Sequence, residues 1–177
     1  MDGPQEQAKH PVSAALAGPY GHPFHPILVT VPIGAWVAGL VFDLASWLVA
    51  DPGFLAQGSV WLIGLGVLGA VAAALVGLLD LFAIPTGTPA FRLGLMHMTL
   101  NLAVIAAYAV NFAWRQADYG QPGPVSAGML AVSAASLIVL AVSGYLGGKL
   151  AYRYGVRVAD ETTQATGYTT RDDPADR

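Results

Sequence analysis

The sequence predicts an all-α integral membrane protein, namely an antiparallel bundle of four membrane-spanning helices. Hydrophobic residues make up 55% of the 177 positions, charged residues make up only 11%, and the mean hydropathy is +0.56. Soluble domains carry about 25% charged residues. Between positions 11 and 148 the charged residues are confined to Asp43, Asp51, Asp80, Arg92, Arg115 and Asp118. Four apolar segments fill this region, each long enough to cross a hydrocarbon core of about 30 Å as a helix.

The apolar segments are separated by short runs that are rich in proline and glycine and that end helices. The segments cover residues of about 26–50, 57–84, 92–114 and 125–150. Short connections make consecutive helices antiparallel. Lipid-exposed backbone must pair within its own helix, which excludes an open sheet. We therefore expect a domain of four transmembrane helices over residues 25–156, preceded by an N-terminal segment at 1–24.

The first span opens on the run His22-Pro23-Phe24-His25-Pro26. Proline suits the first helical position, because its missing N–H would have no partner there. His25 is therefore expected to cap the helix, and Pro32 is expected to kink it. Near the other end of this span, Asp43 is expected to be a neutral carboxyl group or to cap a loop backbone.

Polar residues also mark the following spans. Asp80 lies four residues before the end of the second span, and Arg92 opens the third. His97 and Asn101 lie one turn apart on the same face of the third helix. The fourth span carries a small residue at every fourth position over residues 127–135, which lets helices approach closely in lipid.

The basic residues near the ends of the spans predict that both termini are cytoplasmic, since basic residues concentrate on that side of a membrane. In this orientation the cytoplasmic side carries Lys9, Arg92, Lys149, Arg153 and Arg157. The other side carries Arg115 alone, which is interpreted as a loop or interface residue. Residues 157–177 are polar and lack apolar periodicity, and they predict a disordered cytoplasmic tail.

The composition also excludes several classes of function. A nucleic-acid-binding protein needs a basic surface, and this chain lacks one. The chain has no cysteine, which removes thiolate metal sites and cysteine nucleophiles. No nucleophile–base pair, phosphate-binding glycine loop or two-carboxylate site is recognisable in the sequence. Enzymatic activity of the chain on its own is therefore not expected.

The predicted topology brings four ionisable side chains to one membrane leaflet. The first span begins, the second ends and the third begins on the same side, which groups His25, Asp80, Arg92 and His97. Ionisable residues within spans are costly and are candidates for function. Asp43 lies about 27 Å from His25 along the same helix, at a rise of about 1.5 Å per residue, and belongs to the other leaflet.

Three interpretations of this group are open. In the first, Asp80 pairs with Arg92, and His97 with Asn101 fixes the helix packing of a cofactor-free structural or assembly subunit. In the second, His25 and His97 are the axial ligands of a haem b, with Asn101 beside His97 and Arg92 near the propionates. In the third, the group holds a metal ion or relays protons, and its members are His22, His25, Asp80 and His97.

A larger set of residues runs through all four spans. It comprises His22-Pro23-x-His25-Pro26-x-x-Val29-x-x-Pro32-Ile33-Gly34-x-Trp36, Phe42-Asp43, Leu79-Asp80, Arg92-x4-His97-x3-Asn101 and Gly144-x-Leu146-Gly147-Gly148-Lys149-Leu150-x-Tyr152-x-Tyr154-Gly155-Val156. This set resembles the bacterial membrane family known as domain of unknown function 2231. The resemblance implies a four-span membrane protein without an assigned activity. Some relatives carry a Rieske-type iron–sulfur domain after the last span, which implies proximity to electron transfer.

The expected function is that of a small subunit of the bacterial cytoplasmic (inner) membrane with a redox or electron-transfer role through haem b. The alternative is a cofactor-free structural or assembly subunit that packs against a larger membrane complex. The expected partners are the lipid bilayer and either another membrane protein or a second copy of the chain. A transporter is not favoured, because no internal repeat or pair of interrupted helices is evident in the sequence.

Overall fold

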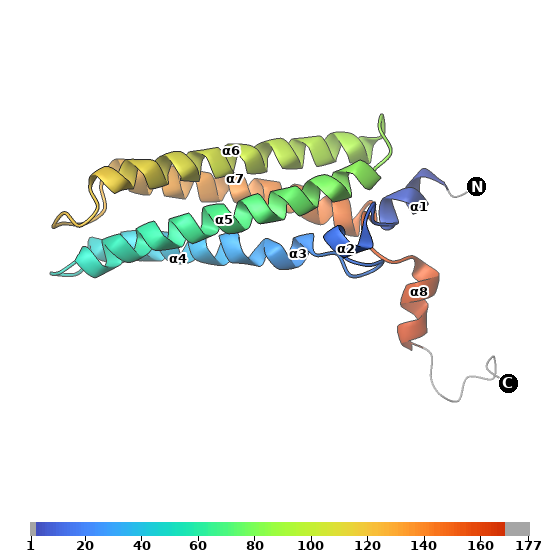
Figure 1. Cartoon of the computed structure of the whole chain (residues 1–177), viewed down its shortest axis with the longest axis horizontal. Helices are drawn as coiled ribbons and strands as arrows, with labels where there is room; N and C mark the ends of the chain where they lie inside the picture. The colour runs from blue at the N-terminus through green and yellow to red at the C-terminus, as the bar shows by residue number, and fades with distance from the viewer. Residues whose placement is uncertain (1–2, 169–177) are drawn as a thin grey trace.

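The computed structural model describes residues 3–168, and its regular elements over this range are all helices, as predicted. The four spans are α3 with α4, then α5, α6 and α7 (Figure 1); their bounds are His25–Leu28, Thr30–Ser46, Gly53–Ala83, Pro89–Ala117 and Ala127–Tyr152. All four spans are long and apolar enough to cross a membrane. The short elements outside the spans are α1 (Pro4–Lys9), α2 (Ala14–Ala17), α8 (Glu161–Ala165) and the 3-10 turn η1 (Thr166–Tyr168).

Helices α3 and α4 form one span with a break at Val29. Pro32 has no N–H to donate to the carbonyl of Leu28, which is the bond that a continuous helix needs at this point. The helix is therefore interrupted about one turn before the proline. The span ends at Ser46, four residues before the predicted end at residue 50.

The third span is longer than predicted at both ends. Helix α6 begins at Pro89, because the side chain of Thr88 accepts a hydrogen bond from a backbone N–H of the first turn and proline fills the first helical position. The helix ends at Ala117, three residues beyond the predicted end at residue 114. Arg115 consequently lies inside the helix and not in a loop.

Figure 1 shows the long helices side by side, with both ends of the described chain at one end of the bundle. We call this end the terminal end and the opposite end the far end. Helix α4 packs against α5 and helix α6 against α7, and further contacts join α5 to α6 and α4 to α7. The bundle therefore consists of two antiparallel hairpins, hairpin one at residues 25–83 and hairpin two at residues 89–152.

Two stacked aromatic rings fill the core in the middle of the bundle. Trp36 of α4 and Tyr108 of α6 are buried and stack with their ring centroids 4.1 Å apart and their planes 9° apart. The indole N–H of Trp36 donates to the Ile63 carbonyl, and the Tyr108 hydroxyl donates to the Ser133 carbonyl. Both rings are thus buried with their polar atoms hydrogen-bonded, and they bring α4 and α6 together across the centre.

The terminal end is held together by Arg157, which the sequence analysis placed in the tail. Its side chain is buried, and its Nε donates to Asp80 Oδ1 at 2.7 Å. Its other nitrogens donate to backbone carbonyls of the N-terminal segment, namely those of Lys9, Ala17 and Gly18. The predicted pairing of Asp80 with Arg92 is therefore incorrect, since Arg92 is exposed and the partner comes from beyond the last span.

Defined structure continues beyond Arg157. The Tyr20 hydroxyl donates to Asp160 Oδ2 at 2.7 Å, and Asp160 Oδ1 caps α8 by accepting the backbone N–H of Thr163. The disorder predicted from residue 157 is not found in residues 157–168. The rest of the predicted tail, 169–177, lies outside the described residues.

Candidate functional site

His25 and His97 face each other near the terminal end of the bundle. His25 is the first residue of α3, and His97 lies in the third turn of α6. Their ring centroids are 6.2 Å apart, and their planes are nearly perpendicular, at 83°. The structure therefore brings together the two histidines that the sequence analysis grouped by topology.

Each of these histidines donates one ring N–H to a backbone carbonyl of the neighbouring helix. His25 Nδ1 lies 2.9 Å from the Ala73 carbonyl of α5, and His97 Nδ1 lies 2.8 Å from the Ser143 carbonyl of α7. A carbonyl oxygen can only accept a hydrogen bond, so Nδ1 carries the proton in both rings. In a neutral imidazole the lone pair is then on Nε2, which is the arrangement of a histidine that binds a metal ion.

A glycine next to each histidine makes room for its ring. A Cβ atom on Gly77 of α5 would lie 2.9 Å from Cε1 and Nδ1 of His25, and a Cβ atom on Gly147 of α7 would lie 2.9 Å from Cε1 of His97. Both distances are shorter than a van der Waals contact. Glycine at these two positions therefore allows each imidazole to lie against the backbone of the neighbouring helix.

Asn101 contacts the second nitrogen of His97. Its Nδ2 lies 3.0 Å from His97 Nε2, one helical turn away, as the predicted common face of the two residues requires. Ser143 adds a further contact, since its hydroxyl oxygen lies 3.0 Å from His97 Nδ1. The His97 ring is thus fixed from both nitrogens, whereas no contact to Nε2 of His25 is found among residues 3–168.

The other predicted site residues do not join the histidine pair as a metal-binding group. His22 is exposed, and its Nδ1 lies 3.4 Å from the carbonyl of Tyr20. Asp80 is bound by Arg157. Within the described range, no group of three or more histidine, aspartate or glutamate side chains could hold a metal ion, so the predicted set of four ligands is not assembled there.

A second polar cluster lies at the far end, and the sequence analysis missed it. Asp43 and Arg115 form a bidentate ion pair with distances of 2.8 and 2.7 Å, and their exposed fractions are 0% and 3%. The other N–H groups of Arg115 are donated to Asn111, Ser59 and Ser133. All five N–H donors of a guanidinium are therefore used.

This ion pair corrects two predictions. Asp43 was expected to be neutral or to cap a loop, and Arg115 was expected to be a loop or interface residue. The error lies in the predicted end of the third span, since α6 carries Arg115 into the bundle. The topological argument that groups His25 with His97 also groups Asp43 with Arg115, because spans one and three end on the same side.

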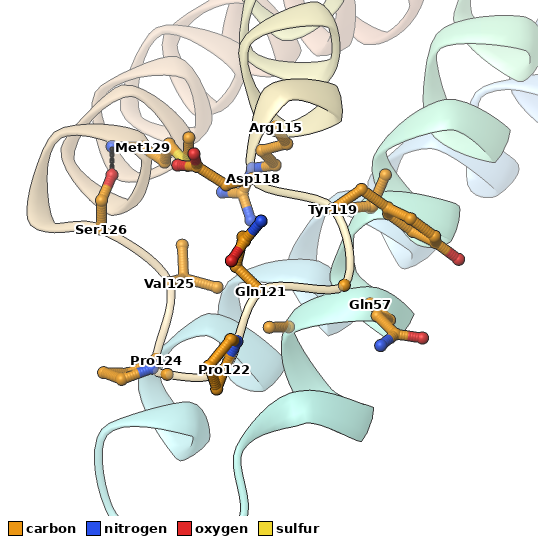
Figure 2. Close-up of a pocket in the computed structure, with 14 residues that line it drawn as sticks. Gln57, Arg115, Asp118, Tyr119, Gln121, Pro122, Pro124, Val125, Ser126 and Met129 are labelled. Carbon is orange, nitrogen blue, oxygen red and sulfur yellow. Dashed lines mark hydrogen bonds between the residues drawn. The ribbon is translucent and has the colours of Figure 1, made fainter.

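A cavity of about 250 Å³ lies over Arg115 at the far end. Figure 2 shows the loop between α6 and α7 curving around it, with the Gln121 side chain directed toward Arg115. Gln57, Asp118 and Tyr119 also line the cavity. Because every N–H of Arg115 is already donated to a side chain, the guanidinium has no free donor for an anion in this cavity.

The two hairpins repeat one arrangement of side chains. Three residues of hairpin one face three of hairpin two, and the pairs are His25 with His97, Trp36 with Tyr108, and Asp43 with Arg115. The members of each pair are 72 positions apart in the chain. Both hairpins begin at the terminal end. They are therefore related by a pseudo-two-fold axis that runs along the bundle and passes between the two members of each pair.

The hydrogen bonds follow the same repeat. The two histidines donate to carbonyls 48 and 46 positions further along the chain, and the two stacked aromatic residues donate to carbonyls 27 and 25 positions further along. Gly77 and Gly147 occupy equivalent places under the two imidazoles. The sequence analysis found no internal repeat because the matched residues differ in type at two of the three pairs.

Comparison with known proteins identifies a family. The family model described as "Predicted membrane protein (DUF2231)" matches residues 21–160. Neither the curated proteins nor the solved structures yield a match to the chain.

Proposed function

The chain belongs to the DUF2231 family of predicted membrane proteins, and we propose that it holds a haem b between His25 and His97 and takes part in electron transfer. One observation carries the proposal. Two imidazoles, one from each hairpin, face each other, and both donate their Nδ1–H to backbone carbonyls. In their neutral form, both rings would then carry the Nε2 lone pair that binds haem iron.

The separation of the two rings supports a single metal centre between them. A histidine nitrogen binds a transition metal ion at about 2 Å, so two imidazoles that bind one ion from opposite sides would have ring centroids roughly 6 to 6.5 Å apart. The centroids of His25 and His97 are 6.2 Å apart. Hydrogen bonds from Nδ1 to a carbonyl also fix the tautomer and the orientation of histidine ligands.

The chain and the cofactor have separate parts in this proposal. Haem b would supply one-electron chemistry. The chain would supply the two ligands, an apolar membrane environment and a cation for the propionates. Arg92 would contact the propionates, as predicted from the sequence. It is exposed at the start of α6 and has no carboxylate partner in residues 3–168.

The proposed setting is the cytoplasmic membrane of a bacterium, with both termini inside. The five-to-one distribution of basic residues supports this orientation, which would place the histidine pair in the cytoplasmic leaflet. A membrane-bound redox partner would then exchange electrons with the site. This partner is required because the chain contains no cysteine for an iron–sulfur cluster of its own.

An absorption spectrum of the detergent-purified protein tests haem binding. We expect a Soret band in the oxidised protein and a sharp alpha band after reduction with dithionite. His25→Ala and His97→Ala should each remove at least half of the Soret absorbance per protein. His22→Ala is the matched control, because His22 lies in the same run but is exposed, and it should retain the bands. A colourless wild-type protein from haem-replete cells would contradict the proposal and favour the cofactor-free assembly subunit.

The angle between the imidazole planes gives a second, independent test. Axial imidazoles that are nearly perpendicular produce a strongly anisotropic low-spin signal in electron paramagnetic resonance, whereas parallel imidazoles produce a rhombic one. The angle of 83° between His25 and His97 therefore predicts the anisotropic signal in the oxidised protein. A rhombic low-spin spectrum would show that these two rings, in this orientation, are not the ligands.

A further inference from the structure

The outward surface of α7 near the terminal end carries a row of polar side chains. Four residues lie within an arc of about 100° on this helix and its C-terminal cap, and we call them the α7 ridge; they are Tyr145, Lys149, Tyr152 and Arg153. The exposed fractions of Tyr145 and Tyr152 are 73% and 92%. Arg153 is also exposed, and Lys149 is partly exposed. The α7 ridge therefore faces the surroundings of the bundle and not its core.

The two cations of the α7 ridge have no carboxylate partner among residues 3–168. The ion pairs of this range join Lys9 and His10 to Glu6, Arg115 to Asp43, and Arg157 to Asp80. Lys149 lies in the last turn of α7, and the backbone N–H of Arg153 donates to the Lys149 carbonyl at 3.1 Å. Two uncompensated positive charges are thus held about one turn apart along the helix.

The repeat of the two hairpins provides a comparison for this surface. Gly77 of α5 corresponds to Gly147 of α7, since each lies under the histidine of its hairpin. Counting along both helices from these glycines gives the equivalents of the α7 ridge in hairpin one, which are Leu75, Leu79, Phe82 and Ala83. All four are apolar. The hairpin therefore folds without charges or hydroxyl groups at these positions, and helix packing does not explain the polar residues of the α7 ridge.

The level of the α7 ridge in the membrane indicates what it contacts. Helix α7 has 26 residues and is about 39 Å long, whereas the hydrocarbon core of a bilayer is about 30 Å thick. The helix therefore extends beyond the core, and its charged end lies in the headgroup layer, where a cation avoids the cost of burial in lipid. Lipid phosphates lie in the same layer.

We propose that the α7 ridge binds the headgroup of an anionic phospholipid. Lys149 and Arg153 would contact the phosphodiester, and the Tyr152 hydroxyl would donate a hydrogen bond to it. A phosphodiester offers a negative charge and acceptor oxygens, which match two cations and an O–H donor. A zwitterionic headgroup carries its own amine, which compensates the phosphate and weakens this attraction. The inference goes beyond the proposed function and does not depend on the haem site.

Lipid binding to the full-length protein in detergent tests this inference. Native mass spectrometry counts the lipids that stay bound during titration with phosphatidylglycerol or with phosphatidylcholine, and we expect the wild type to prefer phosphatidylglycerol. Lys149→Leu/Arg153→Ala copies hairpin one and should lower the affinity for phosphatidylglycerol about ten- to thirtyfold, since each basic residue at a lipid surface contributes about fivefold. Tyr152→Phe removes one hydroxyl group and should lower this affinity about threefold.

Lys149→Gln and Lys9→Gln form a matched pair of variants. Both remove one positive charge from the terminal end, but the Lys9 ammonium is already paired with Glu6 at 3.8 Å. Lys149→Gln should lower the affinity for phosphatidylglycerol about fivefold, whereas Lys9→Gln should leave it unchanged. Lys149→Gln keeps a polar side chain, so it decides the question even if the double variant does not fold.

Three results would overturn the inference. The first is equal binding of the two lipids by the wild type. The second is an equal preference for phosphatidylglycerol in the wild type and in Lys149→Gln, which would place the lipid elsewhere on the protein. The third is displacement of phosphatidylglycerol by an equal concentration of inorganic phosphate, which would make the α7 ridge a site for free anions and not for a lipid.

Discussion

At the scale of single residues, two glycines determine how closely the histidine rings approach their carbonyl acceptors on the neighbouring helices. Gly77 and Gly147 lie under the imidazoles of His25 and His97, at distances that leave no room for a methyl group. Glycine normally weakens a helix by about 1 kcal/mol relative to alanine. These two glycines are therefore explained by contact with the rings and not by helix stability.

Replacing Gly147 by alanine tests this explanation. The new methyl group would lie 2.9 Å from His97 Cε1, so we expect the free energy of unfolding in detergent to fall by about 1–3 kcal/mol, the usual range for overpacking. Gly148→Ala is the control, because a Cβ atom at Gly148 has no atom within 4 Å. The control should be neutral or stabilising by about 1 kcal/mol. Equal effects of the two substitutions would show that the His97 ring does not depend on the glycine.

At the scale of helices, the Asp43–Arg115 pair connects all four spans. Arg115 of α6 binds Asp43 of α4, Ser59 of α5 and Ser133 of α7. Helices in lipid gain no hydrophobic stabilisation from one another, so polar contacts contribute to which helices pair. The ion pair thereby fixes the arrangement of the spans at the far end.

Removing one member of this pair should be far more costly than removing both. Arg115→Met leaves the Asp43 carboxylate buried without a partner, and we expect it to lower the free energy of unfolding by about 3–5 kcal/mol. The double variant Asp43→Leu/Arg115→Met has no unpaired charge and should recover most of this loss. Asp51→Asn, at an exposed loop position, is the control and should change little. If Arg115→Met and the double variant were equally unstable, the unpaired Asp43 carboxylate would not be the cause of the lost stability.

At the scale of the whole molecule, the topology and the meeting of His25 with His97 were predictable, because span length and the sides on which spans begin are properties of the sequence. The partner of Asp80 was not predictable. Arg157 lies in a polar stretch beyond the last span, in a left-handed backbone conformation with φ of 59°. Its burial depends on carbonyl groups of Lys9, Ala17 and Gly18 that only the folded N-terminal segment brings to it.

The far-end cluster was missed for a different reason. The predicted third span stopped at residue 114, and this placed Arg115 outside the membrane. A basic residue just beyond the end of a span ordinarily reaches the headgroups. The burial of Arg115 is compensated by the Asp43 carboxylate and by Ser59, Asn111 and Ser133, which come from three different helices.

The opposite charges at Asp43 and Arg115 have a further consequence for a membrane that holds many copies of the chain. Two copies of hairpin one would bring two Asp43 carboxylates together, and two copies of hairpin two would bring together two Arg115 guanidinium groups. Uncompensated charges of this kind are costly within a bilayer. Of these pairings, only that of unlike hairpins brings opposite charges together, so we expect a newly inserted first hairpin to pair with a second hairpin rather than with another first hairpin.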